Sequence, residues 1–167
     1  MSCRSRNDCF VKTDVTFKRE FRAKLSTAQV VDDHGYGFVC PAGVDCDAHA
    51  CISFCFSEDL SSVRFSIDVL GVEDLSSIQL HMGDAGHNGC TFAHLYGKDA
   101  SEEPVVAKPR FHKSGVLTNA SLAPAQDCVN GPTTIADVLS LIRLGLVYVQ
   151  VDSVEFPHGV LRAQIFN

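Results

Sequence analysis

The chain has 167 residues, 46% of them hydrophobic, which is enough for one domain with a core of its own. Its formal charge is −6, and it lacks a Lys/Arg cluster with interleaved aromatic residues, which excludes the electrostatic pattern of a nucleic-acid-binding protein. No apolar run reaches the roughly 20 residues that cross a bilayer, so we expect no membrane span.

The start of the chain shows little periodicity, and we expect residues 1–15 to form an arm ahead of a single domain at 16–167. The arm is basic at its start but lacks the apolar region of a secretory signal. From residue 16 to residue 31, hydrophobic side chains such as Phe21 and Leu25 alternate with charged ones, which predicts a first strand. A turn at 32–37 precedes a short second strand that we expect to start at 37–40.

Eight cysteines in a strand-rich chain of this size predict disulfide bonds. The missing signal favours the opposite interpretation, free thiols, unless the chain is oxidised outside the usual secretory route, as in some large-virus particles, or has had a signal removed. Connectivity stays open, although a bond between Cys90 and Cys128 is one pairing that we consider. The disulfide candidates are Cys3, Cys9, Cys40, Cys46, Cys51, Cys55, Cys90 and Cys128.

A loop at residues 40–51 is rich in Pro, Gly and Asp and contains residue types that bind zinc. The candidate zinc ligands are Cys40, Cys46, His49, Cys51 and Cys55. Their spacing differs from that of a zinc knuckle, and Cys51 and Cys55 share one face of the predicted strand CISFCF. We therefore favour disulfide bonds that close this loop over a zinc site.

The most regular pattern lies at residues 62–89 and predicts two strands followed by a polar turn. Hydrophobic residues alternate with mostly polar ones in the first strand; they are Val63, Phe65, Ile67 and Val69. Residues 71–77 are predicted to be a connection, and 78–82 a second strand that ends in a turn rich in Gly, Asp and Asn at 83–89. Because His81, Asp84 and His87 come together there, we place the candidate chemical site at this turn.

The second half of the chain contains further strands and one helix. A strand is predicted at 91–96, an exposed excursion at 97–114, brief strand pairing at 116–123, and final strands at 146–151 and 160–166. Residues 119–121 form a glycosylation acceptor sequence, which matters only in a glycosylating compartment.

Hydrophobic residues at helical spacing predict a short helix near residues 135–144, which we expect to close one end of the sheets. Thr134 and Asp137 form a capping pair at its start, and Gly145 fits its end.

Three segments, in order, resemble the CHRD domain, the module repeated in chordin and found alone in many bacterial and some viral proteins. They are FRAKLSTAQVV, SVRFSIDVLGVEDLSSIQLHMGDAGHNG and GLVYVQVDSVEFPHGVLRAQIF, with the short helix before the last. The resemblance covers residues 17–166. It implies an all-β Greek-key β-sandwich or flattened barrel, similar in outline to copper,zinc superoxide dismutase, with one short helix near 135–144.

The chain departs from this family at two of three histidine positions. The family usually has His-x-His at the end of the second strand and a further His after the YV strand, where this chain has Gln79, His81 and Asp152. Copper and zinc prefer imidazole ligands, so the replacements weaken an inherited metal site. We predict instead a structural cluster in which these three residues hydrogen-bond one another. Arg162, at the position of the family's arginine, is predicted to pair with the carboxylate of Asp152 or Asp84.

No catalytic motif of the G-x-S-x-G or H-E-x-x-H type is present, nor a phosphate-cradling glycine loop before a helix. Cys90 near His87 and His94 is the best nucleophile candidate, and a disulfide is the preferred role for that cysteine. We therefore expect a non-enzymatic structural or interaction module without a cofactor. Its expected partners are other proteins, including further copies of itself, in an extracellular or virion assembly.

Two alternative functions stay open. One is a copper- or zinc-binding protein with His81, His87 and Asp152 as ligands, and this alternative includes redox activity like that of superoxide dismutase. The other, growth-factor binding as in chordin, rests on the family resemblance alone.

Overall fold

The computed structural model describes residues 19–31, 46–97, 105–107, 110–123 and 127–166. Within these residues, antiparallel strands form one sheet in the order β5-β4-β8-β9-β1-β2-β3-β7, and β6 pairs with β4 beside this path. The strands are β1 (Glu20–Ser26), β2 (His49–Phe56), β3 (Ser62–Leu70), β4 (Val72–Met82), β5 (Cys90–Tyr96), β6 (Val105–Ala107), β7 (Phe111–Thr118), β8 (Val147–Ser153) and β9 (Leu161–Gln164). One α-helix, α1 (Ile135–Arg143), and two 3-10 turns, η1 (Thr27–Gln29) and η2 (Asn119–Ser121), complete the described elements.

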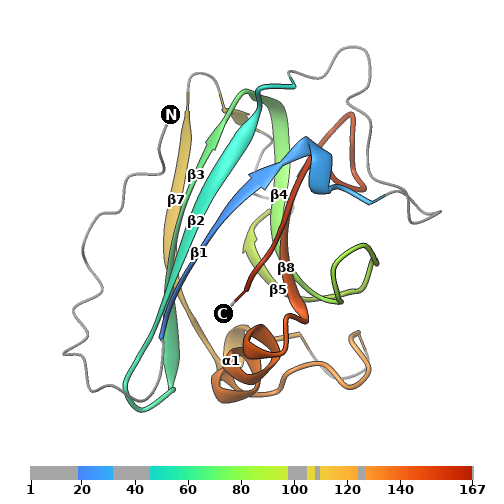
Figure 1. Ribbon diagram of the computed structural model, residues 1–167. Helices are drawn as coiled ribbons and strands as arrows, with labels where there is room; N and C mark the ends of the chain where they lie inside the picture. Colours follow the sequence, from blue (N-terminus) through green and yellow to red (C-terminus); the bar gives the residue numbers. More distant parts are fainter. Residues whose placement is uncertain (1–18, 32–45, 98–104, 108–109, 124–126, 167) are drawn as a thin grey trace.

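The sheet bends into two halves that face each other (Figure 1). Strands β1, β2, β3 and β7 form one half, and β4, β5, β8 and β9 form the other. The halves are hydrogen-bonded at one corner, where Ser26 of β1 pairs with Arg162 of β9. The chain crosses directly from β3 to β4 through Gly71, whose φ of +76° suits glycine. This nearly closed, barrel-like sheet confirms the predicted all-β sandwich or flattened barrel.

Alternation of side chains across the strands builds the core between the halves. The predicted inward residues of β3, Val63, Phe65, Ile67 and Val69, are all buried. They lie opposite inward residues of β2, with Ile52 paired to Ile67 and Phe54 to Phe65. The strand at the centre of the sequence prediction is therefore confirmed with the correct face inward.

Two segments that were predicted to lack strand structure are strands. Residues 72–77, predicted to be a connection, begin β4, where Val72 and Leu75 are buried. Register shifts between these two residues interrupt the alternation, so the strand period is hidden in the sequence. The predicted excursion at 97–114 contains β6 and the start of β7. In β7 the inward positions include Lys113 and Gly115, so its burial pattern is not a hydrophobic one.

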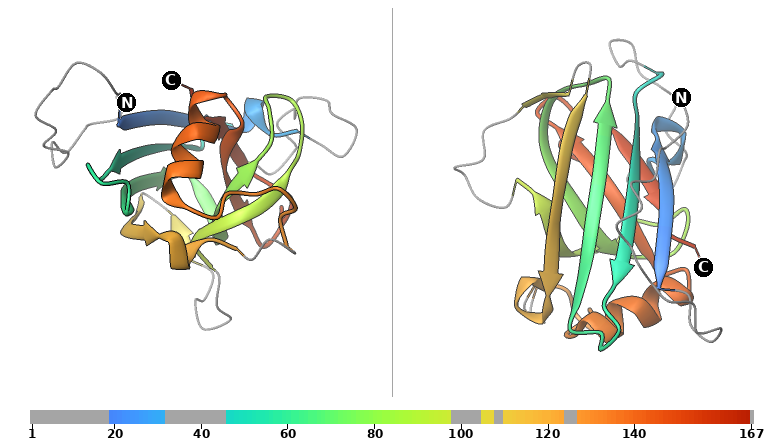
Figure 2. Two further views of the ribbon diagram at one scale, coloured as in Figure 1. Left: turned by 90° about the horizontal axis from the view of Figure 1, so that it is seen from below. Right: turned by 90° about the vertical axis from the view of Figure 1, so that its left-hand side faces the viewer.

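The predicted helix is confirmed as α1, which covers one end of the barrel (Figure 2, left). The Thr134 hydroxyl accepts a hydrogen bond from the Asp137 amide at 3.1 Å, and the Asp137 carboxylate accepts one from the Thr134 amide at 2.9 Å. This is the reciprocal capping box. The Asn119 side-chain oxygen also accepts from the Ile135 amide at 2.8 Å, which ties the helix start to η2.

Several predictions lie outside the described residues. They are the arm at 1–15, the turn and strand at 32–40, and the roles of Cys3, Cys9 and Cys40. The boundaries of the single domain remain a prediction. Among the described helices, none is long and apolar enough to span a bilayer.

Candidate functional site

The predicted site residues lie on the face of β4, β8 and β9 that points away from the core. Alternation puts Ile78 and Leu80 in the core and their neighbours on the opposite side. Register extends this arrangement across the strands: Gln79 pairs with Gln150 and then Arg162, and His81 pairs with Tyr148 and then Gln164. We call this set the polar face; it consists of Ser77, Gln79, His81, Tyr148, Gln150, Asp152, Arg162 and Gln164.

Apart from Gln79, which is half-buried, the residues of the polar face are buried although they lie outside the barrel, and the turn at residues 83–89 folds over part of the face. His81 is 7% exposed, Asp152 4% and Arg162 2%. Gln164 donates from its side-chain nitrogen to the carbonyl of Gly83 at 2.8 Å, at the start of that turn. Polar groups at this depth must find partners within the protein.

A three-layer stack forms the centre of the polar face. The ring of Tyr148 lies parallel to that of His81, with centroids 4.7 Å apart and an interplanar angle of 6°. On the other side, the guanidinium carbon of Arg162 lies 3.6 Å from the Tyr148 centroid. The planar, weakly hydrated guanidinium suits this stacking contact.

Arg162 holds the turn in place through hydrogen bonds. It donates to the side-chain oxygen of Asn88 at 3.0 Å, the carbonyl of His87 at 2.7 Å and the carbonyl of Asp84 at 3.2 Å. These acceptors differ from the predicted ones, which were the carboxylates of Asp152 and Asp84. The acceptors are instead one side-chain oxygen and two backbone carbonyls, all presented by the folded turn.

Asp152 lies further along the polar face and is bonded by uncharged donors. The Ser77 hydroxyl donates to it at 2.8 Å and the Gln150 side chain at 2.9 Å. The Gln79 side chain in turn donates to the Ser77 hydroxyl at 3.0 Å. Burial raises the pKa of the Asp152 carboxyl above its usual value, and the hydrogen bonds from Ser77 and Gln150 oppose that shift.

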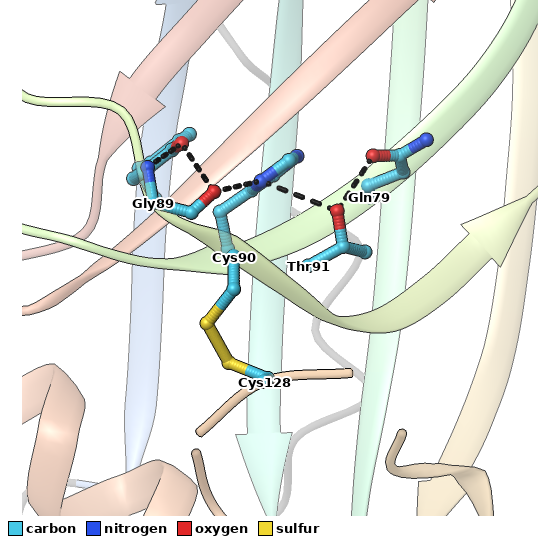
Figure 3. The surroundings of a disulfide bond; sticks show 7 residues. Gln79, Gly89, Cys90, Thr91 and Cys128 are labelled. Atoms are coloured by element: carbon cyan, nitrogen blue, oxygen red, sulfur yellow. Dashed lines mark hydrogen bonds between the residues drawn. A yellow bond between two sulfur atoms is a disulfide. The ribbon is translucent and has the colours of Figure 1, made fainter. Parts of the chain in front are cut away.

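His81, near the end of β4, is bonded to the turn and to β5. Its Nδ1 lies 3.1 Å from the carbonyl of Gly89 and 3.4 Å from the hydroxyl of Thr91, which also donates to Gln79 at 3.1 Å (Figure 3). Its Nε2 is buried and has no hydrogen-bond partner among the described residues. Gln79 and Asp152 are thus joined through Ser77, and His81 is joined to Gln79 through Thr91, rather than by the direct bonds that we predicted.

The considered disulfide, Cys90–Cys128, is present beside this network (Figure 3). Cys46, Cys51 and Cys55 are disulfide-bonded as well. These bonds agree with the preferred interpretation of the cysteines. They leave no thiolate for a zinc ligand or a nucleophile among the described cysteines.

The structure does not bring the three alternative metal ligands together. The His87 side chain is exposed on the turn, where its Nδ1 lies 3.2 Å from the carboxylate of Asp84. His81 pairs with Tyr148 and Asp152 with Ser77, so the Gln79–Gln150 pair separates them on the polar face. No group of three His, Cys, Asp or Glu side chains in the described part of the chain is arranged to hold a metal. These residues therefore do not fit copper or zinc.

Burial makes His81 a source of pH-dependent stability. Desolvation, opposed by the hydrogen bond to Gly89 and assisted by repulsion from Arg162 and His94, lowers its pKa from 6.5 to about 4. Between these values the unfolded chain binds a proton that the folded protein does not, so stability falls as pH falls from about 6.5 to 4. We expect a loss of up to about 3 kcal/mol in the free energy of unfolding from this residue.

Urea unfolding at several pH values measures this loss, with His81→Gln as the comparison variant. Asp152 acts in the opposite direction, since its raised pKa adds stability as the carboxyl protonates. Asp152 is present in both proteins, so their difference isolates His81. If the free energy of unfolding changed equally with pH in both proteins over this range, His81 would not be the cause of the loss.

Comparisons with known proteins give one match. The model of the CHRD domain family matches residues 21–165, nearly the whole chain. No curated protein and no solved structure matches it. The match includes all of the polar face and the turn that covers it.

Proposed function

The chain belongs to the CHRD domain family, and from this premise we propose that it is a non-enzymatic module that binds other proteins in an extracellular layer or a virus particle. CHRD domains are generally extracellular interaction modules, and the family is not known for catalysis. The extracellular interaction role follows from the family. The particular assembly and the absence of catalysis are our proposal.

The arrangement of the polar face carries this proposal. The residues best suited to chemistry, His81, Asp152 and Arg162, are buried and bonded to neighbouring groups of the same fold. A substrate would have to displace the turn at 83–89 to reach Arg162. This arrangement supports a structural role, in which the polar face fixes the turn and the strand ends in one geometry.

The oxidised cysteines support the proposed location. Disulfides persist in oxidising compartments and in particles assembled under oxidising conditions. We expect acid-quenched native material, titrated in denaturant, to show few free thiols before reduction. Thiol reactivity from all eight cysteines in such material would contradict the extracellular or particle location.

The binding role is tested by cross-linking the protein in the material from which it comes and measuring the mass of the products. We expect one defined complex in which this chain is stoichiometric with a partner or with itself. A monomer in that material, together with turnover of a substrate by the purified protein, would overturn the proposal. Elemental analysis is the companion measurement, and we expect no stoichiometric copper or zinc.

A further inference from the structure

The sequence Asn119-Ala120-Ser121 is the single N-x-S/T acceptor sequence for N-linked glycans in the chain. It forms η2, the 3-10 turn that follows β7. The chain that leaves β7 reaches this turn at the end of the barrel where α1 lies (Figure 2, right). Asn119 and Ala120 are exposed, and no residue of η2 is buried. The folded protein therefore presents the acceptor sequence on its surface.

The two polar atoms of the Asn119 side chain have different surroundings. Oδ1 accepts a hydrogen bond at 2.8 Å from the amide of Ile135, one of the donors that the first turn of α1 leaves unpaired. Nδ2 has no hydrogen-bond partner among the described residues. Because Oδ1 is directed at the helix and the residue is exposed, Nδ2 faces the solvent on the other side of the planar amide. An N-linked glycan is joined to Nδ2, so the modified side chain could keep its contact with Ile135.

Asn88 has the opposite arrangement, because the fold uses both polar atoms of its side chain. Its Nδ2 donates to the carbonyl of Val31 at 3.1 Å, and its Oδ1 accepts from Arg162 at 3.0 Å. The contact between Asn119 and the helix needs only an acceptor oxygen, which an aspartate at a helix N-terminus supplies equally well. The amide nitrogen of Asn119 therefore has no role in the part of the fold that the structure describes.

We propose that Asn119 carries an N-linked glycan in the native protein, an inference that rests on the extracellular location in the proposed function. The donor is an oligosaccharide on a lipid diphosphate. Asn119 Nδ2 forms a bond to the anomeric carbon of the sugar, and the bond between that carbon and the phosphate oxygen breaks. The lipid diphosphate leaves, and Nδ2 gives one proton to a base of the transferase, with no oxidation or reduction.

The fold indicates when this transfer takes place. The Ser121 hydroxyl, which belongs to the acceptor sequence, accepts a hydrogen bond from the Thr118 amide at 3.0 Å once η2 has formed. We therefore place the transfer before this turn closes, while the chain is still unfolded in the secretory compartment. The Cys90–Cys128 disulfide is consistent with such a compartment, because disulfides form and persist under oxidising conditions. Folding then keeps the modified side chain at the surface.

The test is mass spectrometry of the protein from its native material, before and after treatment with peptide N-glycosidase in heavy-oxygen water. We expect added mass in hexose and N-acetylhexosamine units, which the enzyme removes while it converts Asn119 to a labelled aspartate. Asn130 is exposed but followed by Gly-Pro, so it lies outside an acceptor sequence and should gain no label that depends on the enzyme. Native peptides that cover residue 119 and carry no added mass would overturn the proposal.

Variants of the full chain, secreted from eukaryotic cells, locate the modification. Asn119→Asp keeps the acceptor oxygen for Ile135 and should lose the glycan completely. Ser121→Ala should lose it as well, although Asn119 is unchanged, and it replaces Asn119→Asp if that variant fails to fold. Ser121→Thr preserves the acceptor sequence and should keep the glycan. A glycan that persists in Asn119→Asp or Ser121→Ala would refute the site.

The glycan and the binding function can fail separately. If native Asn119 is unmodified and the cross-linked complex still forms, the inference is wrong and the binding function stands. If native Asn119 is glycosylated and the chain forms no complex, the inference is supported and the binding function fails.

Discussion

Replacing Arg162 with alanine should lower the free energy of unfolding by about 3–5 kcal/mol, an effect typical of breaking a buried charged network. Arg162 is 2% exposed and bonds three oxygens of the turn at 83–89. Truncation removes the Arg162 donors from all three oxygens, of which the Asp84 carbonyl keeps a bond from the His87 amide, and it removes one side of the Tyr148 stack. Urea denaturation at neutral pH measures the change.

Two variants show whether the geometry of Arg162 matters more than its charge. Arg162→Lys keeps the charge but loses the planar fork and the stacking contact, so it should recover only part of the lost stability. Arg22→Ala removes an exposed arginine that pairs with Glu20 and should change stability by about 0.5 kcal/mol or less.

The same experiment can follow the turn directly. We expect amide exchange in residues 83–89 to accelerate in Arg162→Ala while α1 stays protected, because the lost bonds belong to the turn. A loss below about 1 kcal/mol with an unchanged turn would show that the turn is held by other contacts.

The fold was predictable for elements in which the spacing of hydrophobic residues in the sequence matches the side chains that reach the core. β3 shows strict alternation because both of its neighbours in the sheet are ordinary antiparallel strands. α1 was predictable because its capping box and its apolar stripe are both local in sequence. Such elements can be recognised from their own residues, without knowledge of the rest of the chain.

The start of β4 and most of β7 carried no such signal. Asp74 in β4 has a positive φ of 47° where the pairing register shifts, and this irregularity breaks the period. β7 is an end strand of the described sheet, and Lys113 and Gly115 occupy two of its inward positions, so its sequence lacks the apolar alternation of a central strand.

The sequence predicted most of the residues that make up the candidate site, but not the hydrogen bonds that they form. Alternation within β4 and β8 puts Gln79, His81 and Asp152 on one face of the sheet. This pattern can be recognised within each strand's own residues. The choice of partners depends on strand register and on the folded turn, as in the bond between Arg162 and Asn88, 74 residues apart. Tyr148, the centre of the stack, was missed although it lies four residues before Asp152 and so on the same face.

Removing the Cys90–Cys128 disulfide should lower the free energy of unfolding by about 4 kcal/mol. The two cysteines are 38 residues apart, and the loss of loop-closure restraint in the unfolded chain sets this magnitude. The double variant Cys90→Ala/Cys128→Ala is preferred because a single replacement leaves one thiol that can exchange with the other disulfides. Thermal and urea unfolding under non-reducing conditions measure the effect.

The location of this disulfide predicts which segments will lose local stability when it is removed. Cys90 begins β5 next to Thr91 of the His81 network, and Cys128 is buried in the segment that leads to α1. If the disulfide acts only by restraining the unfolded chain, amide exchange in α1 and β5 should accelerate only as much as the lower global stability requires. If the bond also holds α1 against the barrel end, exchange in the segment at 127–135 should rise beyond that proportion. A stability loss below about 1 kcal/mol would contradict the prediction and would mean that the unfolded chain is already restrained by its remaining disulfides.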